Sequence, residues 1–233
     1  MTTGEAAGHD VVVRAYRQED RERVREICHV TGYMGEPVDW LWRDRESFAD
    51  VFSGYYTDEE PGSAHVVEID GRVEGYLLGC LDSSRAWDAA RVMTRHVLRR
   101  GIAFRPGTAG LIWRSVADIV RDRHAGRPSA ADLDDDVERR FPAHLHIDLM
   151  PVARGRGAGT RLVRAWFDQL HREGHHGCHL RTFAQNAGGI AFFESIGFRK
   201  EGVPVVVPGW RSPNGGRLDV QTMVRDLDDA EGG

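Results

Sequence analysis

Hydrophobic and polar residues alternate along the first third of the chain in a way that predicts short strands and amphipathic helices. The pattern indicates a first strand, two helical segments and a pair of strands, in this order: 11–16, Asp20 to about Gly32, 38–55, 65–69 and 73–81. The last two strands are separated by Asp70-Gly71, a dipeptide that tolerates the positive φ of a two-residue turn. We therefore expect them to form a β-hairpin.

The last third of the chain repeats this alternation of strand and helix. We expect a central strand, a helix that starts after Gly157 and ends at Gly174, a second strand, a second helix and a final hairpin, over these ranges: 145–149, 158–174, 179–183, 187–196, 198–207 and 219–224. The first of these helices has a continuous apolar stripe, formed by Leu162, Val163, Trp166, Phe167 and Leu170. Strand 179–183 is predicted to lie beside strand 145–149.

Between these two parts lies a segment of about 60 residues, 83–142, that glycines and prolines interrupt. Helical patterns occupy 87–98 and 111–123. A structureless loop of this length is uncommon inside a compact domain. We therefore interpret 83–142 as a helical insertion in a single domain that spans residues 1–233.

The composition is that of a globular protein, with 41% hydrophobic and 29% charged residues among 233. The formal net charge of −5 argues against a nucleic-acid-binding surface, which needs a basic face. Arginines are frequent over 91–127 and acids over 132–138, so we expect these two blocks to neutralise each other or to line opposite sides of the insertion. The polar ends, 1–9 and 226–233, are expected to be frayed.

The cysteines indicate a reducing environment. Cys28, Cys80 and Cys178 are odd in number and have no Cys-x-x-Cys spacing, so we expect three buried free thiols. The N-terminus lacks the basic and apolar regions of an export signal, and no apolar run is long enough to cross a membrane. These features predict a cytoplasmic protein without membrane contact.

The segment Ile147–Leu162 is the most informative part of the sequence. A strand-like apolar run passes through a turn with Gly155, Gly157 and Gly159 directly into an amphipathic helix. Glycines let a ligand approach the backbone, and the first N–H groups of a helix attract anions. The turn is thus predicted to bind a phosphate group.

Two common phosphate-binding motifs do not fit this turn. A dinucleotide-binding fingerprint that uses Gly155 and Gly157 would need a third glycine where Thr160 stands. The Gly-Lys-Ser/Thr tripeptide of a P-loop is absent from the sequence. Kinase and ATPase interpretations therefore lose their main support.

The motif that does fit is Arg-x-x-Gly-x-Gly at Arg154, Gly157 and Gly159, which resembles the diphosphate-binding turn of the GNAT superfamily of N-acetyltransferases. Downstream, Asn186-Ala-Gly-Gly-Ile-Ala-Phe-Phe-Glu-Ser-Ile-Gly-Phe198 resembles the second signature of that family. The order and spacing of the two signatures also match. The run 143–149 is similar to a GNAT subgroup that includes the acetyltransferase-like C-terminal domain of O-GlcNAcase and its bacterial relatives.

The resemblance implies an α/β fold, with a mixed and mostly antiparallel sheet of about seven strands, a central parallel pair that splays apart, and helices on both faces. It also implies acetyl-CoA as cosubstrate and transfer of the acetyl group to a primary amine by direct attack in a ternary complex. The residues implied to bind acetyl-CoA are Leu149, Met150, Arg154, Gly155, Arg156, Gly157, Ala158, Gly159, Thr160, Asn186 and Phe193. In such an enzyme the insertion is expected to cap the acceptor site or to form a homodimer surface.

Catalysis requires a base more than an acid. Deprotonating an alkyl ammonium at pH 7 costs about 4.6 kcal/mol, whereas release of an unprotonated thiolate costs about 2 kcal/mol. Candidates for the base are His146 and Asp148, which share one face of the central strand with His144. We expect the carboxylate to polarise the histidine. In the relatives that carry a base on this strand, the corresponding positions are Ala143 and Leu145, one residue out of phase.

The family's general acid is a tyrosine in the second signature, and Phe193 occupies that position here. Phenylalanine cannot donate a proton. Either water or another residue such as Tyr33 protonates the thiolate, or the protein binds acyl-CoA without catalysis. Phe193 and the buried histidines could equally be ordinary core residues.

Three alternatives remain open at this point. A metal site on His144, His146, His175, His176 and His179 is disfavoured, because no carboxylate or cysteine completes a ligand set. A catalytically silent acyl-CoA sensor would explain Phe193. A toxin-like or protein-modifying acetyltransferase would use the arginine-rich insertion to hold an acidic partner.

Overall fold

The computed structural model describes residues 10–127 and 135–228, which form a seven-stranded sheet in the order β1-β2-β3-β4-β5-β7-β6. Neighbouring strands are antiparallel except for β4 and β5, which are parallel. The strands are β1 (Val11–Ala15), β2 (Ala64–Ile69), β3 (Arg72–Cys80), β4 (Ala143–Leu149), β5 (Gly177–Phe183), β6 (Arg199–Arg211) and β7 (Arg217–Asp226). The predicted mixed sheet with one central parallel pair is confirmed.

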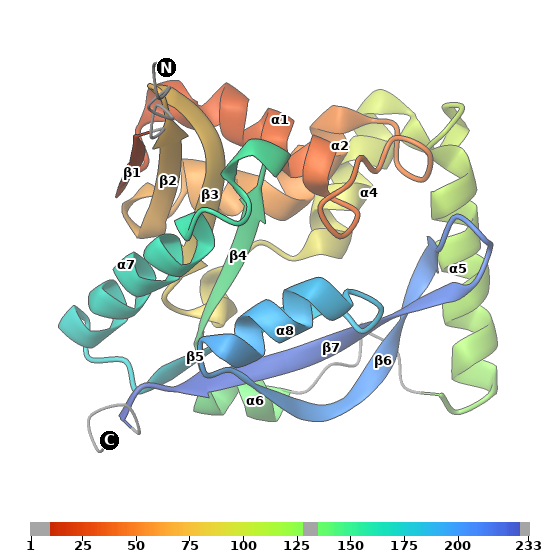
Figure 1. The fold of residues 1–233 in the computed structure, drawn as a ribbon. Coiled ribbons are helices and arrows are strands. Elements are labelled where there is room, and N and C mark those ends of the chain that lie inside the picture. Colours follow the sequence, from red (N-terminus) through yellow and green to blue (C-terminus); the bar gives the residue numbers. More distant parts are fainter. Residues whose placement is uncertain (1–9, 128–134, 229–233) are drawn as a thin grey trace, which may run out of the picture.

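Helices cover both faces of the sheet (Figure 1). They are α1 (Arg21–Thr31), α2 (Arg45–Ala49), the π-helical turn η2 (Asp50–Gly54), α3 (Tyr55–Asp58), α4 (Ala89–Arg100), α5 (Ala109–His124), α6 (Asp135–Arg140), α7 (Ala158–Arg172) and α8 (Ala187–Ser195). One hydrophobic core joins α1, α2 and α3 to the sheet, and a second core joins α7 and α8 to the opposite face.

Local sequence accounts for most of these elements. Asp70 and Gly71 both adopt positive φ, as the two-residue turn between β2 and β3 requires. Leu162, Trp166 and Leu170 are fully buried along α7, as their helical spacing predicts.

The helix predicted over 38–55 is wrong at its start. Val38, Leu41 and Trp42 are buried core residues with helical spacing, but they lie outside any helix. The helix begins only at Arg45, because the Asp44 carboxylate accepts the Ser47 N–H at 2.9 Å and caps it. The spacing of these apolar residues therefore results from their burial in the core and does not indicate a helix.

The parallel strands β4 and β5 part soon after they meet. Within the described chain, their partner pairs are Ala143 with Cys178 and His144 with His179, and no later residue of β4 is paired with β5. This parting is the splay implied by the family resemblance. It leaves a gap in the middle of the sheet where both faces can be reached.

The segment 83–142 contains α4 and α5, close to the predicted ranges, and the short helix α6, which the sequence analysis missed. α5 packs against β6, and its buried Asp118 and Asp122 form ion pairs with Arg211 and Arg217. Whether the segment is an insertion into a single domain stays a prediction.

The predicted pairing of the arginine block with the acids 132–138 does not describe Arg95 and Arg100 of α4 or Arg105 after it. Arg95 lies 3.3 Å from Asp50, while Arg100 and Arg105 lie 3.0 and 3.3 Å from Asp44. Residues 132–134 lie outside the described part of the chain. The basic segment is therefore held against α2 and η2, which fixes α4 over that part of the fold.

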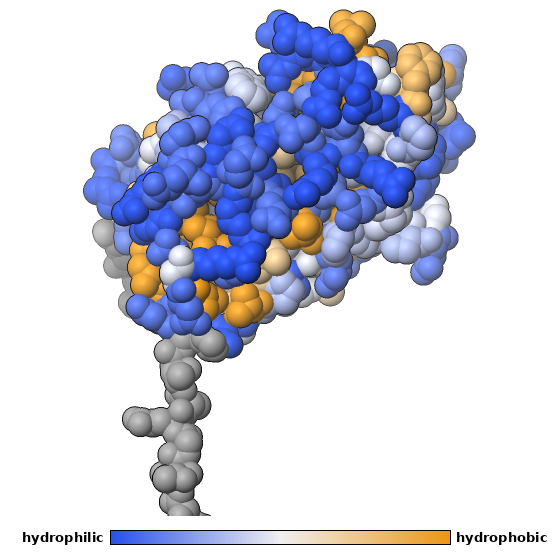
Figure 2. All heavy atoms as spheres, turned by 90° about the horizontal axis from the view of Figure 1, so that it is seen from above, coloured by the Kyte–Doolittle hydropathy of each residue, from blue (hydrophilic) through white to orange (hydrophobic). Residues whose placement is uncertain are grey.

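The surface seen in Figure 2 is mostly hydrophilic, with separate apolar groups. Of the ten large apolar side chains exposed in the described residues, six belong to α4, α5 and the turn between them: Leu98, Phe104, Trp113, Val116, Ile119 and Val120. Among the described helices, none is long and apolar enough to cross a membrane. A homodimer stays a prediction.

Two smaller predictions concern the cysteines and the chain ends. Cys28, Cys80 and Cys178 are free and buried, as expected. The predicted fraying from residue 226 is wrong for Asp226, the last residue of β7, and for Leu227, which is buried and donates its N–H to the His176 carbonyl at 2.8 Å. Residues 1–9 and 229–233 lie outside the described part.

Candidate active site

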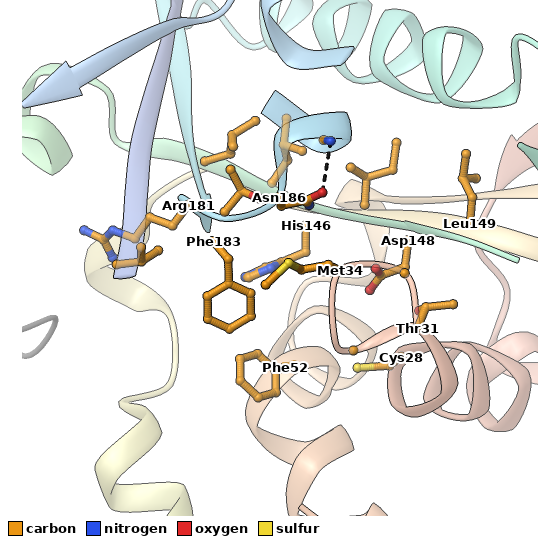
Figure 3. A pocket seen from close by; sticks show the side chains of 18 of the residues that line it. Cys28, Thr31, Met34, Phe52, His146, Asp148, Leu149, Arg181, Phe183 and Asn186 are labelled. Atoms are coloured by element: carbon orange, nitrogen blue, oxygen red, sulfur yellow. Dashed lines mark hydrogen bonds between the residues drawn. The ribbon is translucent and has the colours of Figure 1, made fainter. Parts of the chain in front are cut away.

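A cavity of about 730 Å³ passes through the gap between β4 and β5. Its wall includes residues of α1, η2, β3, β4, β5, β6 and α8, so it is open to both helical layers (Figure 3). On one side lie Asn186, Phe192 and Phe193 of the α8 region. The opposite side carries aromatic residues and the polar side chains of β4, so two reactants can meet in the gap.

Asp148 projects from β4 into this cavity (Figure 3). Tyr76 is its cross-strand partner on β3, and the Tyr76 hydroxyl donates a hydrogen bond of 2.5 Å to the Asp148 carboxylate. Burial raises the pKa of Asp148 to about 7, although the hydrogen bonds from Tyr76 and Thr31 act in the opposite direction. A carboxyl group with this pKa can accept a proton near neutral pH.

His146, the other predicted base, also lines the cavity. Burial, with the nearby charge of Arg181, lowers its pKa to about 4, so its imidazole is neutral at physiological pH. The expectation that Asp148 polarises this histidine is wrong, because no hydrogen bond joins these two described side chains and the charges that act on the pKa of His146 are those of Arg181 and His179. His146 instead packs edge to face against the Tyr56 ring, with 5.3 Å between centroids. It is thus a weaker proton acceptor than Asp148.

The other histidines of this region hold the structure together. His144 is hydrogen-bonded to the Tyr56 hydroxyl at 2.7 Å and to the Ser83 hydroxyl at 2.6 Å. His179 Nδ1 lies 2.7 Å from the Phe141 carbonyl. In the described residues, no group of three or more histidines, cysteines or acids is arranged to hold a metal ion.

The glycine-rich turn lies exposed directly before α7. Gly155 and Gly157 have φ values of +69° and +73°, and residues 154–157 are exposed. α7 begins at Ala158, so the N–H groups of Ala158, Gly159 and Thr160 belong to the unpaired first turn of a helix. Such a turn is suited to a phosphate group.

Arg154 is placed differently from the expectation. Its guanidinium donates hydrogen bonds to the carbonyls of Leu149 at 3.0 Å and Gly35 at 2.5 Å. Arg154 therefore links the turn to the segment after α1, whereas Arg156, which is also exposed, forms no such link to the described residues. Of the two arginines, Arg156 has the freer side chain to reach an anion.

The edge of β4 that faces the gap follows from its pairing. The Met150 N–H is bonded to the Glu74 carbonyl at 2.8 Å and so faces β3. Because N–H groups alternate along a strand, those of Ile147 and Leu149 face the gap. The groups available to a ligand are thus the main-chain groups of Ile147 and the N–H of Leu149, because the Leu149 carbonyl accepts from Arg154 and the Met150 N–H faces β3.

Asn186 and Phe193 line the α8 side of the cavity. The Asn186 side chain accepts the Gly189 N–H at 3.0 Å and caps α8, while its amide nitrogen lies 3.3 Å from the Thr182 hydroxyl. Phe193 packs between Phe192 and Phe198, with centroid distances of 5.3 and 5.8 Å. Phe193 is therefore both a core residue and part of the cavity wall.

Tyr33, the candidate acid, lies in the segment after α1. Its ring packs against Trp40 and Phe183, with centroid distances of 5.1 and 6.4 Å. Burial raises the pKa of its hydroxyl, so Tyr33 stays protonated at neutral pH. Among the described residues that form the cavity wall, Tyr33 is absent, although its neighbour Phe183 is present.

Sequence analysis missed several residues of the cavity wall: Cys28, Thr31, Tyr76, Arg181 and Phe183. They come from α1, β3 and β5, so their meeting depends on strand register. Alternation along 179–183 was the one available signal, since Arg181 and Phe183 have the same parity as His179.

The sequence model described as the Acetyltransferase (GNAT) family matches residues 34–198. The chain belongs to this family. The predicted family membership is thereby confirmed. The parted strands β4 and β5 and the turn 154–160 all lie within the matched region.

Other proteins resemble this GNAT chain over different lengths. An uncharacterized N-acetyltransferase of Methanocaldococcus jannaschii is 33% identical over 76 residues, and the match spans 32% of each of the two chains. The crystal structure of SsHAT superimposes with a TM-score of 0.67 at 26% identity and covers 93% of this chain and 98% of its own.

Two further structures share the fold. A putative acetyltransferase from Salmonella typhimurium, determined with its cofactor acetyl-CoA, has a TM-score of 0.55 at 17% identity and covers 94% of this chain and 95% of its own. A Drosophila melanogaster polyamine N-acetyltransferase that forms N-acetylagmatine has a TM-score of 0.54 at 18% identity, and the match covers 94% of this chain and 100% of that structure's chain. At these identities the likeness extends to the fold alone.

Proposed function

We propose that this GNAT protein is an acetyl-CoA-dependent N-acetyltransferase that moves the acetyl group to a primary amine by direct attack in a ternary complex. The observation that carries the proposal is one continuous cavity that joins the α8 side of the gap to Asp148. A thioester can enter from one side and an amine from the other.

The cosubstrate is held by three parts of the chain. The main-chain N–H groups of Ala158, Gly159 and Thr160, together with Arg156, bind the diphosphate at the start of α7. The pantetheine arm runs along the free edge of β4, where the main-chain groups of Ile147 and Leu149 face it. Asn186 and Phe193 form the opposite wall.

Asp148 is the proposed general base. At neutral pH its carboxylate takes a proton from the bound ammonium group, and the free amine then attacks the thioester carbonyl carbon. A C–N bond forms, the C–S bond breaks, and the electron pair leaves with the thiolate sulfur. The N–H groups of Ile147 or Leu149 stabilise the oxyanion that develops on the carbonyl oxygen.

Tyr76 positions Asp148 and holds its pKa near neutrality. Phe193 leaves the thiolate without a neighbouring acid at the family's usual position, so water supplies this proton. Loss of an unprotonated thiolate costs about 2 kcal/mol at pH 7, which a working enzyme can tolerate. The missing tyrosine therefore lowers the rate without abolishing the reaction.

The test combines titration calorimetry with acetyl-CoA and a thiol-release assay on a panel of primary amines. We expect the wild-type protein to bind acetyl-CoA and to release thiol, and Asp148→Asn to bind equally well but to turn over about 10² to 10⁴ times more slowly. Binding without thiol release from any amine would favour the acyl-CoA sensor. Thiol release with protein substrates alone would favour the protein-modifying enzyme.

A further inference from the structure

The side of the cavity that faces α1 and η2 has an uneven distribution of charge. Among the described residues that line the cavity, Asp148 is the only carboxylate, while Arg154 and Arg181 are the cations. Arg154 donates to two main-chain carbonyls on the turn side. Arg181 is therefore the charged group that an acceptor molecule can meet beyond Asp148.

Arg181 and Asp148 stand at opposite ends of this part of the cavity. His144 is the last residue of β4 paired with β5, with His179 as its partner, and the same register continued past this pair would set Arg181 opposite His146, two residues before Asp148. Two residues of a strand span about 7 Å. In Figure 3 the guanidinium of Arg181 points away from Asp148, the carboxylate of Asp148 points toward His146, and His146 and Phe183 lie between the two charged residues.

The donors of Arg181 are only partly used. Its Nη2 donates to the Glu138 carboxylate at 2.8 Å, and its Nε is buried without a hydrogen-bond partner. A guanidinium has five N–H donors, so a second anion can bind beside Glu138.

Between the two ends the wall is aromatic. Phe183 packs against Trp210 with 5.2 Å between ring centroids, and Phe52 packs against the same indole at 6.2 Å. All three line the cavity. A flat apolar body would fill this space better than a hydrated polar chain.

We infer that the acceptor is a primary amine with an aromatic body and an anionic group, such as a carboxylate, at the end away from the amine. The inference rests on the proposed function. The amine meets Asp148, the ring lies against Phe183 and Trp210, and the carboxylate pairs with Arg181. Polyamines and other dications are poor acceptors, because their second charge would face Arg181.

The test compares phenethylamine, its carboxylate analogue 4-(2-aminoethyl)benzoate and the dication agmatine in the thiol-release assay. For the wild-type protein we expect kcat/KM to be at least about tenfold higher for the benzoate than for phenethylamine, and lowest for agmatine. Arg181→Gln should remove this preference by raising the KM of the benzoate, with phenethylamine changed less than about twofold. Glu138→Gln, which leaves Arg181 in place, should keep the preference.

Other results would overturn the inference. One is equal kcat/KM of the wild type for the two aromatic amines, and another is a higher kcat/KM for agmatine. A third is an equal loss of kcat/KM for both aromatic amines in Arg181→Gln and in Arg181→Lys, when both variants melt at the temperature of the wild type. Absence of turnover with the benzoate would overturn it as well. In that case acetyl-CoA calorimetry and the wider amine panel decide whether the proposed function fails too.

Discussion

Asp148 combines two properties that seldom occur together, because it is enclosed by β3 and α1 and yet faces a cavity. Burial raises its pKa to about 7, and the hydrogen bond from Tyr76 limits that rise. A base of this kind is half ionised at neutral pH. Burial and the hydrogen bond from Tyr76 therefore set together the pH at which Asp148 works.

The pH profile of kcat/KM should rise through about pH 7 as Asp148 loses its proton. Tyr76→Phe removes a hydrogen bond that lowers the pKa of Asp148, so the rise should move to higher pH. Tyr56→Phe, which removes a hydrogen bond to His144, is the matched control and should leave the profile in place. A profile that Tyr76→Phe does not move would contradict the assignment of Asp148 as base.

Phe193→Tyr restores the hydroxyl that the family resemblance implies. Because leaving-group protonation contributes at most about 2 kcal/mol at pH 7, we expect kcat to rise by no more than about thirtyfold. Phe192→Tyr is the control on the neighbouring residue and should give no gain. A rise of several hundredfold would mean that thiolate departure, and not amine deprotonation, limits the reaction.

The start of α8 has a structural and a binding role, which one residue can separate. Asn186 caps the helix through its side-chain oxygen, while its amide nitrogen points to Thr182 beside the cavity. We expect Asn186→Ala to lower the free energy of unfolding by about 1 kcal/mol and Asn186→Asp to preserve it, since aspartate caps equally well. Both variants should bind acetyl-CoA more weakly in calorimetry, and full affinity in Asn186→Asp would argue against a ligand role for the amide.

Sequence periodicity was sufficient for most elements of this fold and for the turn at the start of α7. It failed at 38–44, where Val38, Leu41 and Trp42 have helical spacing because all three are buried in the core. The helix itself starts only after its cap, Asp44. The candidate site was predictable only in part. Asp148 and His146 follow from strand alternation, but the pairing of Asp148 with Tyr76 depends on a strand register that local sequence does not encode.

The insertion segment and the last hairpin are joined by buried charge. Asp118 of α5 accepts the Gly209 N–H at 2.9 Å and lies 2.7 Å from Arg211, next to Trp210 of the cavity wall. Burial by itself would raise the pKa of Asp118, but these hydrogen bonds lower it below the ordinary value. α5 thereby fixes one wall of the acceptor side from outside the sheet.

Asp118→Asn should lower the free energy of unfolding by about 1–3 kcal/mol and raise the KM of the acceptor without changing acetyl-CoA affinity. Because the folded-state pKa is lowered, the stabilisation is present above the unfolded pKa of about 3.9 and is lost as pH falls below it. The difference in stability from the wild type should therefore be constant from pH 6 to 8 and shrink in acid. Asp122→Asn is the control and should leave the KM of the acceptor unchanged. An unchanged KM in Asp118→Asn as well would show that α5 does not shape the site.

The parting of β4 and β5 leaves the sheet as two leaves, β1–β4 and β5–β7, that meet through two residue pairs. A pantetheine arm carries amide groups of its own, so in the gap it would act as a short extra strand. Amide hydrogen exchange should then be fast at Ile147 and Leu149 in the empty protein and slow once acetyl-CoA is added, while β2 stays protected throughout. Loading the cosubstrate would complete the sheet, so that the protein reaches its full rigidity only when it is ready to react.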